Sequence, residues 1–121
     1  MGRYYNGDIN GKFWFGVQSS DDAEQFGATT GEQGYIPYYV EELEPVKERL
    51  EEIFEELGIT PVYYDLEGSN REEEDFYDAY AKYRAEKPGD ATEKLWASLD
   101  IGLRIFHCVR KEGTCSFEAE I

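Results

Sequence analysis

Residues 90–121, DATEKLWASL DIGLRIFHCV RKEGTCSFEA EI, decide the fold class, because they join a core helix to a core strand. Between Asp90 and Gly113, apolar residues recur at helical spacing and cover much of the helix girth, so this helix is expected to be buried on most sides. Gly113 is an expected helix end, and residues 114–121 then alternate between apolar and polar, which is typical of a half-exposed strand. A helix and a strand that both need a covered face predict a layered α+β protein.

Two further helices are predicted upstream of this segment. Residues 41–57 carry apolar side chains at helical spacing and are followed by Gly58, a natural helix cap. Residues 71–85 carry an aromatic stripe at positions 76, 80 and 83, and Lys87-Pro88-Gly89 ends them. Gly102 lies inside the last helix at a cost of about 1 kcal/mol relative to Ala, and close approach to a sheet would be a reason to keep it.

The remaining chain predicts strands and one short helix. The first 18 residues form an expected β-hairpin, with Asn-Gly turn signals, and a short helix is predicted to begin at Ser19. Strands are expected at 35–40, where Pro37 indicates an edge or a bulge, and at 59–66. The whole chain, 1–121, is expected to be one domain, with a small antiparallel or mixed sheet and three helices packed mainly on one face.

The charge is strongly negative and unevenly spread. The formal net charge is −15, and residues 41–90 alone hold 17 acidic and 6 basic residues. Such a surface repels nucleic acid and anionic membranes, and it attracts basic protein patches. We therefore expect a basic protein partner, without direct contact with nucleic acid or membrane.

The acidic residues are densest on the helix predicted at 41–57. Eight carboxylates fall within about 25 Å of helix axis, close to the ~3.4 Å spacing of phosphates along one DNA strand. One hypothesis is nucleic-acid mimicry, in which the protein occupies the basic groove of a DNA- or RNA-binding partner; the other is a solvated face that maintains solubility. The residues expected to bind a partner are Glu48, Glu51, Glu52, Glu55, Glu72, Glu73 and Asp75.

Signatures of catalysis are nearly absent from the sequence. It contains no phosphate-binding glycine loop, nucleophile elbow or paired-histidine zinc motif. The single histidine, His107, is expected on a helix surface or boundary, and Cys108 and Cys115 are expected to be small buried residues in a reducing compartment. The missing catalytic motifs favour a non-enzymatic protein without a cofactor. No apolar signal segment follows Met1, so we expect the protein in the cytoplasm or elsewhere inside the cell.

A ligand or metal site near the N-terminal hairpin is the alternative hypothesis. Carboxylate oxygens suit Mg²⁺ or Ca²⁺, although a capped helix start explains most of the same residues. The candidates are Asp8, Trp14, Asp21, Asp22 and Glu24.

Three Tyr-Tyr pairs are a separate feature of the predicted strands. Outward tyrosines at positions 4–5, 38–39 and 63–64 could join copies of the chain into a homo-oligomer, whereas ordinary cross-strand pairing explains them as well.

The opening stretch GRYYNGDINGKFWFGVQSSDDA, residues 2–23, resembles the start of short uncharacterised proteins encoded by large DNA viruses. The resemblance implies a viral accessory, host-interaction or virion role inside a host cell, and it carries no activity or site. The leading hypothesis is therefore a non-enzymatic acidic interaction protein. A small-ligand or metal-dependent protein and a structural virion subunit are the alternatives.

Overall fold

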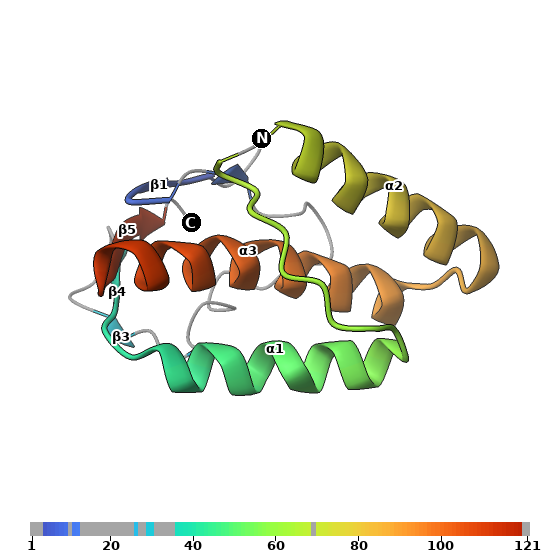
Figure 1. Cartoon of the computed structure of the whole chain (residues 1–121), viewed down its shortest axis with the longest axis horizontal. Helices are drawn as coiled ribbons and strands as arrows, with labels where there is room; N and C mark the ends of the chain where they lie inside the picture. The colour runs from blue at the N-terminus through green and yellow to red at the C-terminus, as the bar shows by residue number, and fades with distance from the viewer. Residues whose placement is uncertain are drawn as a thin grey trace.

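The computed structural model of the chain describes residues 4–9, 11–12, 26, 29–30, 36–68 and 70–119. Its elements follow one another as in Figure 1. The strands are β1 (Tyr4–Gly7), β2 (Gly11–Lys12), β3 (Thr29–Thr30), β4 (Ile36–Val40) and β5 (Cys115–Ala119). The helices are α1 (Leu43–Leu57), α2 (Asn70–Glu86) and α3 (Asp90–Glu112). The helices predicted at 41–57, 71–85 and 90–112 are thus confirmed, whereas the short helix predicted from Ser19 lies outside the described residues.

The five strands form one antiparallel sheet in the order β2-β1-β5-β4-β3. The last strand, β5, lies at its centre, between β1 of the N-terminal hairpin and β4. The prediction for Pro37 needs correction, because β4 is not an edge strand. Its outer neighbour β3 is only two residues long and pairs with Tyr38 and Tyr39, so Pro37 lies beyond that pairing.

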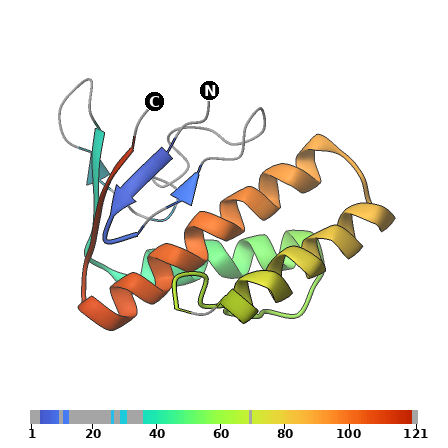
Figure 2. The ribbon, with the colours of Figure 1, turned by 90° about the horizontal axis from the view of Figure 1, so that it is seen from above.

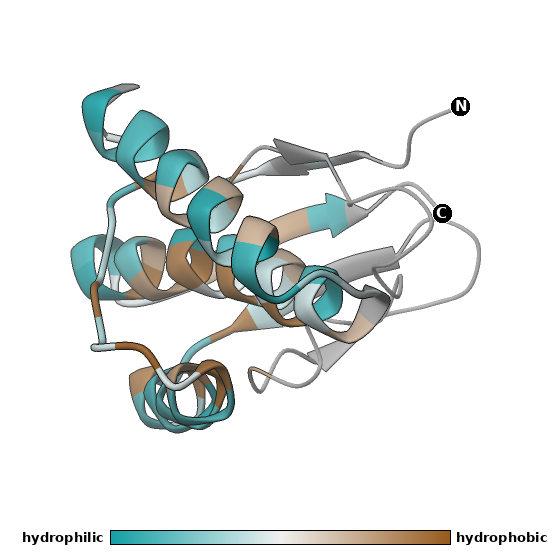
Figure 3. Cartoon of the chain, turned by 90° about the vertical axis from the view of Figure 1, so that its right-hand side faces the viewer, coloured by the Kyte–Doolittle hydropathy of each residue, from teal (hydrophilic) through white to brown (hydrophobic). Residues whose placement is uncertain are grey.

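All three helices lie on one side of the sheet, which confirms the α+β fold (Figure 2). Helix α3 lies between α1 and α2 (Figure 1). Figure 3 shows hydrophobic residues concentrated in the central turns of α3, whereas α2 is hydrophilic along most of its length. Burial follows the same division: residues 96–109 of α3 are all buried, while Phe76 is the fully buried aromatic residue of α2.

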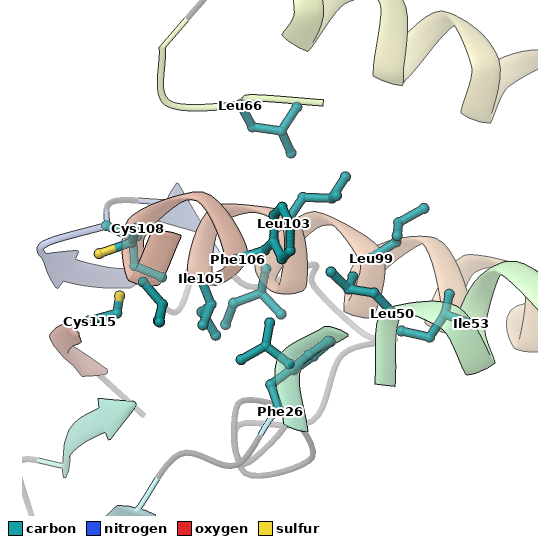
Figure 4. Close-up of a cluster of buried hydrophobic side chains, with 14 of the residues drawn as sticks. Phe26, Leu50, Ile53, Leu66, Leu99, Leu103, Ile105, Phe106, Cys108 and Cys115 are labelled. Atoms are coloured by element: carbon teal, nitrogen blue, oxygen red, sulfur yellow. The ribbon is translucent and has the colours of Figure 1, made fainter. Parts of the chain in front are cut away.

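The core is built where α3 meets α1 on one side and the sheet on the other. Helix α1 contributes the apolar stripe predicted from its spacing, and Figure 4 shows Leu50 and Phe26 gathered beneath α3. From the sheet, Cys115 and Phe117 are buried while Ser116 and Glu118 are exposed, as strand alternation predicts. Burying one face of each element supplies most of the driving force for folding.

The strand predicted at 59–66 is wrong. Residues 59–65 form no regular element, and the segment crosses over α3 on its way to α2 (Figure 1). Tyr63 packs its ring against Phe106 of α3, with centroids 4.9 Å apart, whereas Tyr64 stacks on Phe76 of α2 at 5.9 Å. The two rings therefore contact different helices, so this Tyr-Tyr pair belongs to the helical layer and not to the sheet.

Gly102 is held by helix packing, not by the sheet as predicted. A Cβ atom at this position would lie 2.4 Å from Cε1 of Phe26 and 2.9 Å from Cδ2 of Leu50. Both neighbours are fully buried. Glycine at this position therefore permits α3 to approach α1 and Phe26 more closely than any other residue would allow.

Candidate functional site

The outward face of α1 carries a row of carboxylates. Glu44, Glu48, Glu51 and Glu55 follow one another four, three and four residues apart, so their side chains share one face of the helix over about 16 Å. All four are exposed, and the apolar residues of α1 face the core. We call these four residues the acidic row.

Two basic residues of α1 accompany the acidic row, and Lys47 is exposed within one helical turn of both Glu44 and Glu51. Within the described part of the chain, the only Arg on α1, Arg49, lies 3.2 Å from Glu52 and 4.0 Å from Glu56, on the flank of the helix. No residue of the acidic row forms an ion pair with another described residue. Of the residues predicted to bind a partner, Glu48, Glu51 and Glu55 are thus displayed with their charge unpaired, and Glu52 is paired.

The acidic residues predicted on α2 do not extend this face. Glu72 accepts a hydrogen bond from the backbone N–H of Asp65, and Glu73 lies 3.7 Å from the Arg104 guanidinium. Both are partly buried, whereas Asp75 is exposed. Because α3 separates α1 from α2 (Figure 1), Asp75 belongs to a different surface from the acidic row.

Of the residues predicted to form a ligand or metal site near the N-terminal hairpin, the structure describes only Asp8. Asp8 accepts a hydrogen bond from the Ser116 N–H at 2.9 Å, and its own N–H donates to the Ser116 carbonyl at 2.9 Å. Asp8 thus fastens the end of β1 to β5. Trp14, Asp21, Asp22 and Glu24 lie outside the described residues. Among the residues that are described, no group of three or more His, Cys, Asp or Glu side chains could hold a metal ion.

The buried residues Asp100 and Arg104 of α3 form the centre of a charged network that sequence reasoning missed. Arg104 Nε lies 2.7 Å from Asp100 Oδ1, one helical turn away, and Arg104 Nη1 lies 2.9 Å from Glu67 Oε1. The Tyr77 hydroxyl donates to Asp100 Oδ2 at 2.9 Å. Burial opposes the charge of Arg104, but the neighbouring carboxylates outweigh it and raise the pKa of the guanidinium. Burial, followed by the negative charge of Asp100, likewise raises the pKa of Tyr77 well above its ordinary value.

The spacing of Asp100 and Arg104, four residues apart on α3, was the available signal for this network. Their burial followed only from the fold. Arg104 therefore keeps its charge and Tyr77 keeps its proton near neutral pH, and the network links α2, α3 and Glu67.

His107 and the two cysteines also lie inside the protein. His107 was predicted at a helix surface or boundary, but it is only 9% exposed, and its Nε2 lies 3.1 Å from the Tyr63 carbonyl. Cys108 and Cys115 are free thiols whose sulfur atoms point toward one another (Figure 4). Burial raises the pKa of both thiols, so neither is the thiolate that nucleophilic catalysis requires.

An apolar pocket of about 310 Å³ opens between the crossing segment, α2 and α3. Trp96 and Leu99 of α3 line it, together with Tyr83 of α2 and Val62 of the crossing segment. The Trp96 side chain is only 2% exposed, and its indole N–H has no hydrogen-bond partner among the residues that the structure describes. No local sequence pattern could have revealed this pocket, because its walls come from separate segments.

The comparisons with known proteins assign no family to these features. Within the described residues, no helix is both long and apolar enough to cross a membrane. No family model, curated protein or solved structure matches the chain.

Proposed function

We propose that this is a non-enzymatic interaction protein whose acidic row on α1 binds a basic surface of a protein partner. The observation that carries the proposal is the exposure of four carboxylates on one helix face, none of which forms an ion pair with another described residue. Exposed charges of one sign steer an oppositely charged partner and accelerate its association. The net charge of −15 adds a long-range field of the same sign.

The acidic row favours a basic protein patch over strict nucleic-acid mimicry. Four carboxylates over about 16 Å are more widely spaced than the phosphates of one DNA strand, at about 3.4 Å each. Glu52 would bring the charge density closer to that of DNA, but Arg49 pairs with it at 3.2 Å. Mimicry is the narrower form of the proposal, and competition with duplex DNA for the same partner distinguishes the two forms.

An intracellular setting fits the proposal, since both cysteines are free thiols. The resemblance of residues 2–23 to proteins of large DNA viruses supports a viral accessory role in which the basic partner is a host protein.

The test compares two variants with equal net charge. In the first, all four residues of the acidic row are changed to Gln. In the control, Glu74, Asp75, Asp78 and Glu86, which are exposed on α2, are changed to Gln or Asn. Binding of a fluorescent oligolysine peptide is measured by anisotropy between about 50 and about 300 mM NaCl, a range over which screening of exposed charges increases strongly.

We expect the row variant to bind about tenfold more weakly at low salt, since each exposed pair contributes about 0.2–1 kcal/mol. The control variant should lose less than about threefold, because it changes the overall field but not the row. Equal losses in the two variants would show that net charge alone attracts the peptide, and the acidic row would then have no specific role.

A further inference from the structure

The free thiols of Cys108 and Cys115 meet where α3 turns into the sheet, on elements other than the one that carries the acidic row. Cys108 lies in the last turns of α3, and Cys115 is the first residue of β5, the central strand. Gly113 separates the two elements with a left-handed backbone, at a φ of 86°, and donates its N–H to the Val109 carbonyl at 2.8 Å. The turn therefore brings the start of β5 back to the end of α3.

Hydrogen bonds bring the two sulfur atoms together. Cys108 Sγ donates to the Thr114 carbonyl at 3.6 Å, which places this sulfur beside the residue that precedes Cys115. Burial, followed by a hydrogen bond with Cys108, raises the pKa of Cys115, whereas the same hydrogen bond opposes the effect of burial on the pKa of Cys108. Cys115 is therefore the donor and Cys108 the acceptor, in agreement with the orientation of the two side chains in Figure 4.

The surroundings hold both side chains in place. Cys115 is fully buried and Cys108 is only 8% exposed, and both belong to the hydrophobic core. Cys115 lies opposite Val40 in the pairing of β5 with β4. Side chains in a close-packed core have little freedom to move apart, so a bond between these two sulfur atoms would cost little further conformational entropy.

We propose that Cys108 and Cys115 form a reversible disulfide that joins the end of α3 to the central strand when a low-molecular-weight disulfide such as oxidised glutathione is in excess. A disulfide joins sulfur atoms about 2.05 Å apart, so it forms without large backbone movement only between thiols that are already neighbours in the fold. The hydrogen-bonded thiols at this turn are neighbours of that kind.

The reaction consists of two thiol–disulfide exchanges. The Cys108 thiolate, from the less buried thiol, attacks one sulfur of oxidised glutathione, which forms a mixed disulfide and releases one glutathione thiolate. The Cys115 thiolate then attacks the Cys108 sulfur and releases the second glutathione. The two protein thiols lose two electrons and two protons in total, and oxidised glutathione takes them up and becomes two glutathione thiols.

Burial makes this exchange slow while the protein is closed. It raises the pKa of both thiols, so little of either is the reactive thiolate near neutral pH. Exchange therefore requires the junction between α3 and β5 to open. The pair accordingly responds to a lasting change in redox balance and not to a brief one.

The size of the effect follows from the length of the loop that the disulfide closes, residues 108–115. Restricting the unfolded chain by a loop of this length raises the folding equilibrium constant about 50-fold. Because folding and oxidation form a closed thermodynamic cycle, the folded chain should favour the disulfide over the two thiols by the same factor, relative to the unfolded chain.

The test measures that factor with the full chain. The protein is equilibrated from the reduced and from the oxidised side in glutathione buffers of varied [GSH]²/[GSSG], without urea and in urea that unfolds both forms. After an acid quench, the remaining thiols are alkylated in denaturant, and intact mass separates the internal disulfide from reduced protein, glutathione adducts and dimers. We expect the folded chain to be half oxidised at a [GSH]²/[GSSG] about 50-fold higher than the unfolded chain.

A second measurement follows stability directly. Oxidised glutathione should raise the urea midpoint of the wild-type protein by about 1–2 M, and it should leave the midpoint of Cys115→Ala unchanged, because that variant cannot close the bond. The comparison of folded and unfolded wild-type protein needs no variant, so it holds even if Cys115→Ala does not fold.

A folded chain that is half oxidised at the same or a lower [GSH]²/[GSSG] than the unfolded chain overturns the proposal, because the fold would then keep the sulfur atoms apart. So does a folded chain that yields glutathione adducts or dimers in place of the internal disulfide. Neither measurement involves the acidic row, so this proposal and the proposed function can fail separately.

Discussion

Replacing Gly102 with alanine sets two opposing effects against each other. Alanine in a helix interior is more favourable than glycine by about 1 kcal/mol, so helix propensity alone predicts a more stable protein. The structure predicts the opposite sign. The new methyl group would lie 2.4 and 2.5 Å from two ring atoms of Phe26 and 2.9 Å from Leu50, and neither side chain can move into solvent, because both are fully buried.

The expected loss follows from these two magnitudes. Overpacking a closed core costs about 1–3 kcal/mol, and contacts this short belong at the upper end of that range. After the gain in propensity, Gly102→Ala should destabilise the protein by about 2 kcal/mol. For a chain of this size, that lowers the melting temperature by about 6–8 °C.

Urea unfolding measures the change, since a shift in midpoint at constant m-value reports stability alone. Ala81→Gly, at an exposed position of α2, is the control for propensity and should cost about 1 kcal/mol. In a Phe26→Leu background the clash is relieved, so Gly102→Ala should become neutral or stabilising. A Gly102→Ala protein as stable as the wild type would refute the close approach of α3 to Phe26 and α1.

Three further outcomes test the interior of the protein. Arg104→Met should lower the free energy of unfolding, measured with urea, by about 3 kcal/mol, because it leaves Asp100, which is 4% exposed, buried without its cation. Arg84→Met removes only the exposed ion pair with Glu93 and should lower it by less than about 1 kcal/mol. Burial acts to raise the pKa of Asp65, but hydrogen bonds from Lys111 and the Gly68 N–H outweigh it and lower that pKa. The stability that the ionised carboxylate contributes is therefore present above about pH 4 and is lost as the pH falls through the pKa of the folded state. Asp65→Asn should flatten the acid limb of a curve of unfolding free energy against pH. An unchanged acid limb would contradict that assignment. The two cysteine thiols should react with a thiol reagent only on unfolding, since burial raises the pKa of both, and rapid labelling of the native protein would show that they are accessible.

Local periodicity in the sequence determined the helices and the pattern of the last strand. Apolar spacing in residues 41–57 and 90–112 predicted both the helices and their buried faces, because a helix turn involves only neighbouring residues. The same periodicity predicted that Glu48, Glu51 and Glu55 face outward, and they are exposed.

Residues 59–66 show where local patterns fail. Their composition is typical of a strand, yet the segment crosses α3, and Tyr63 and Tyr64 contact different helices. A strand needs a neighbouring strand to pair with, and the neighbours of this segment are helices. The choice between strand and crossing segment was therefore made by tertiary contacts.

The sequence by itself determined which residues are apolar, where helices can form and where negative charge is dense. Only the tertiary structure decided which of those charges remain unpaired. Arg104 reaches Glu67 across 37 positions of the chain and also lies beside Glu73, while no residue of the acidic row forms an ion pair with another described residue. The pocket beside Trp96 likewise exists only where α2, α3 and the crossing segment meet. The physical reason is that periodicity acts between near neighbours in sequence, whereas ion pairs and cavities depend on which distant surfaces come into contact.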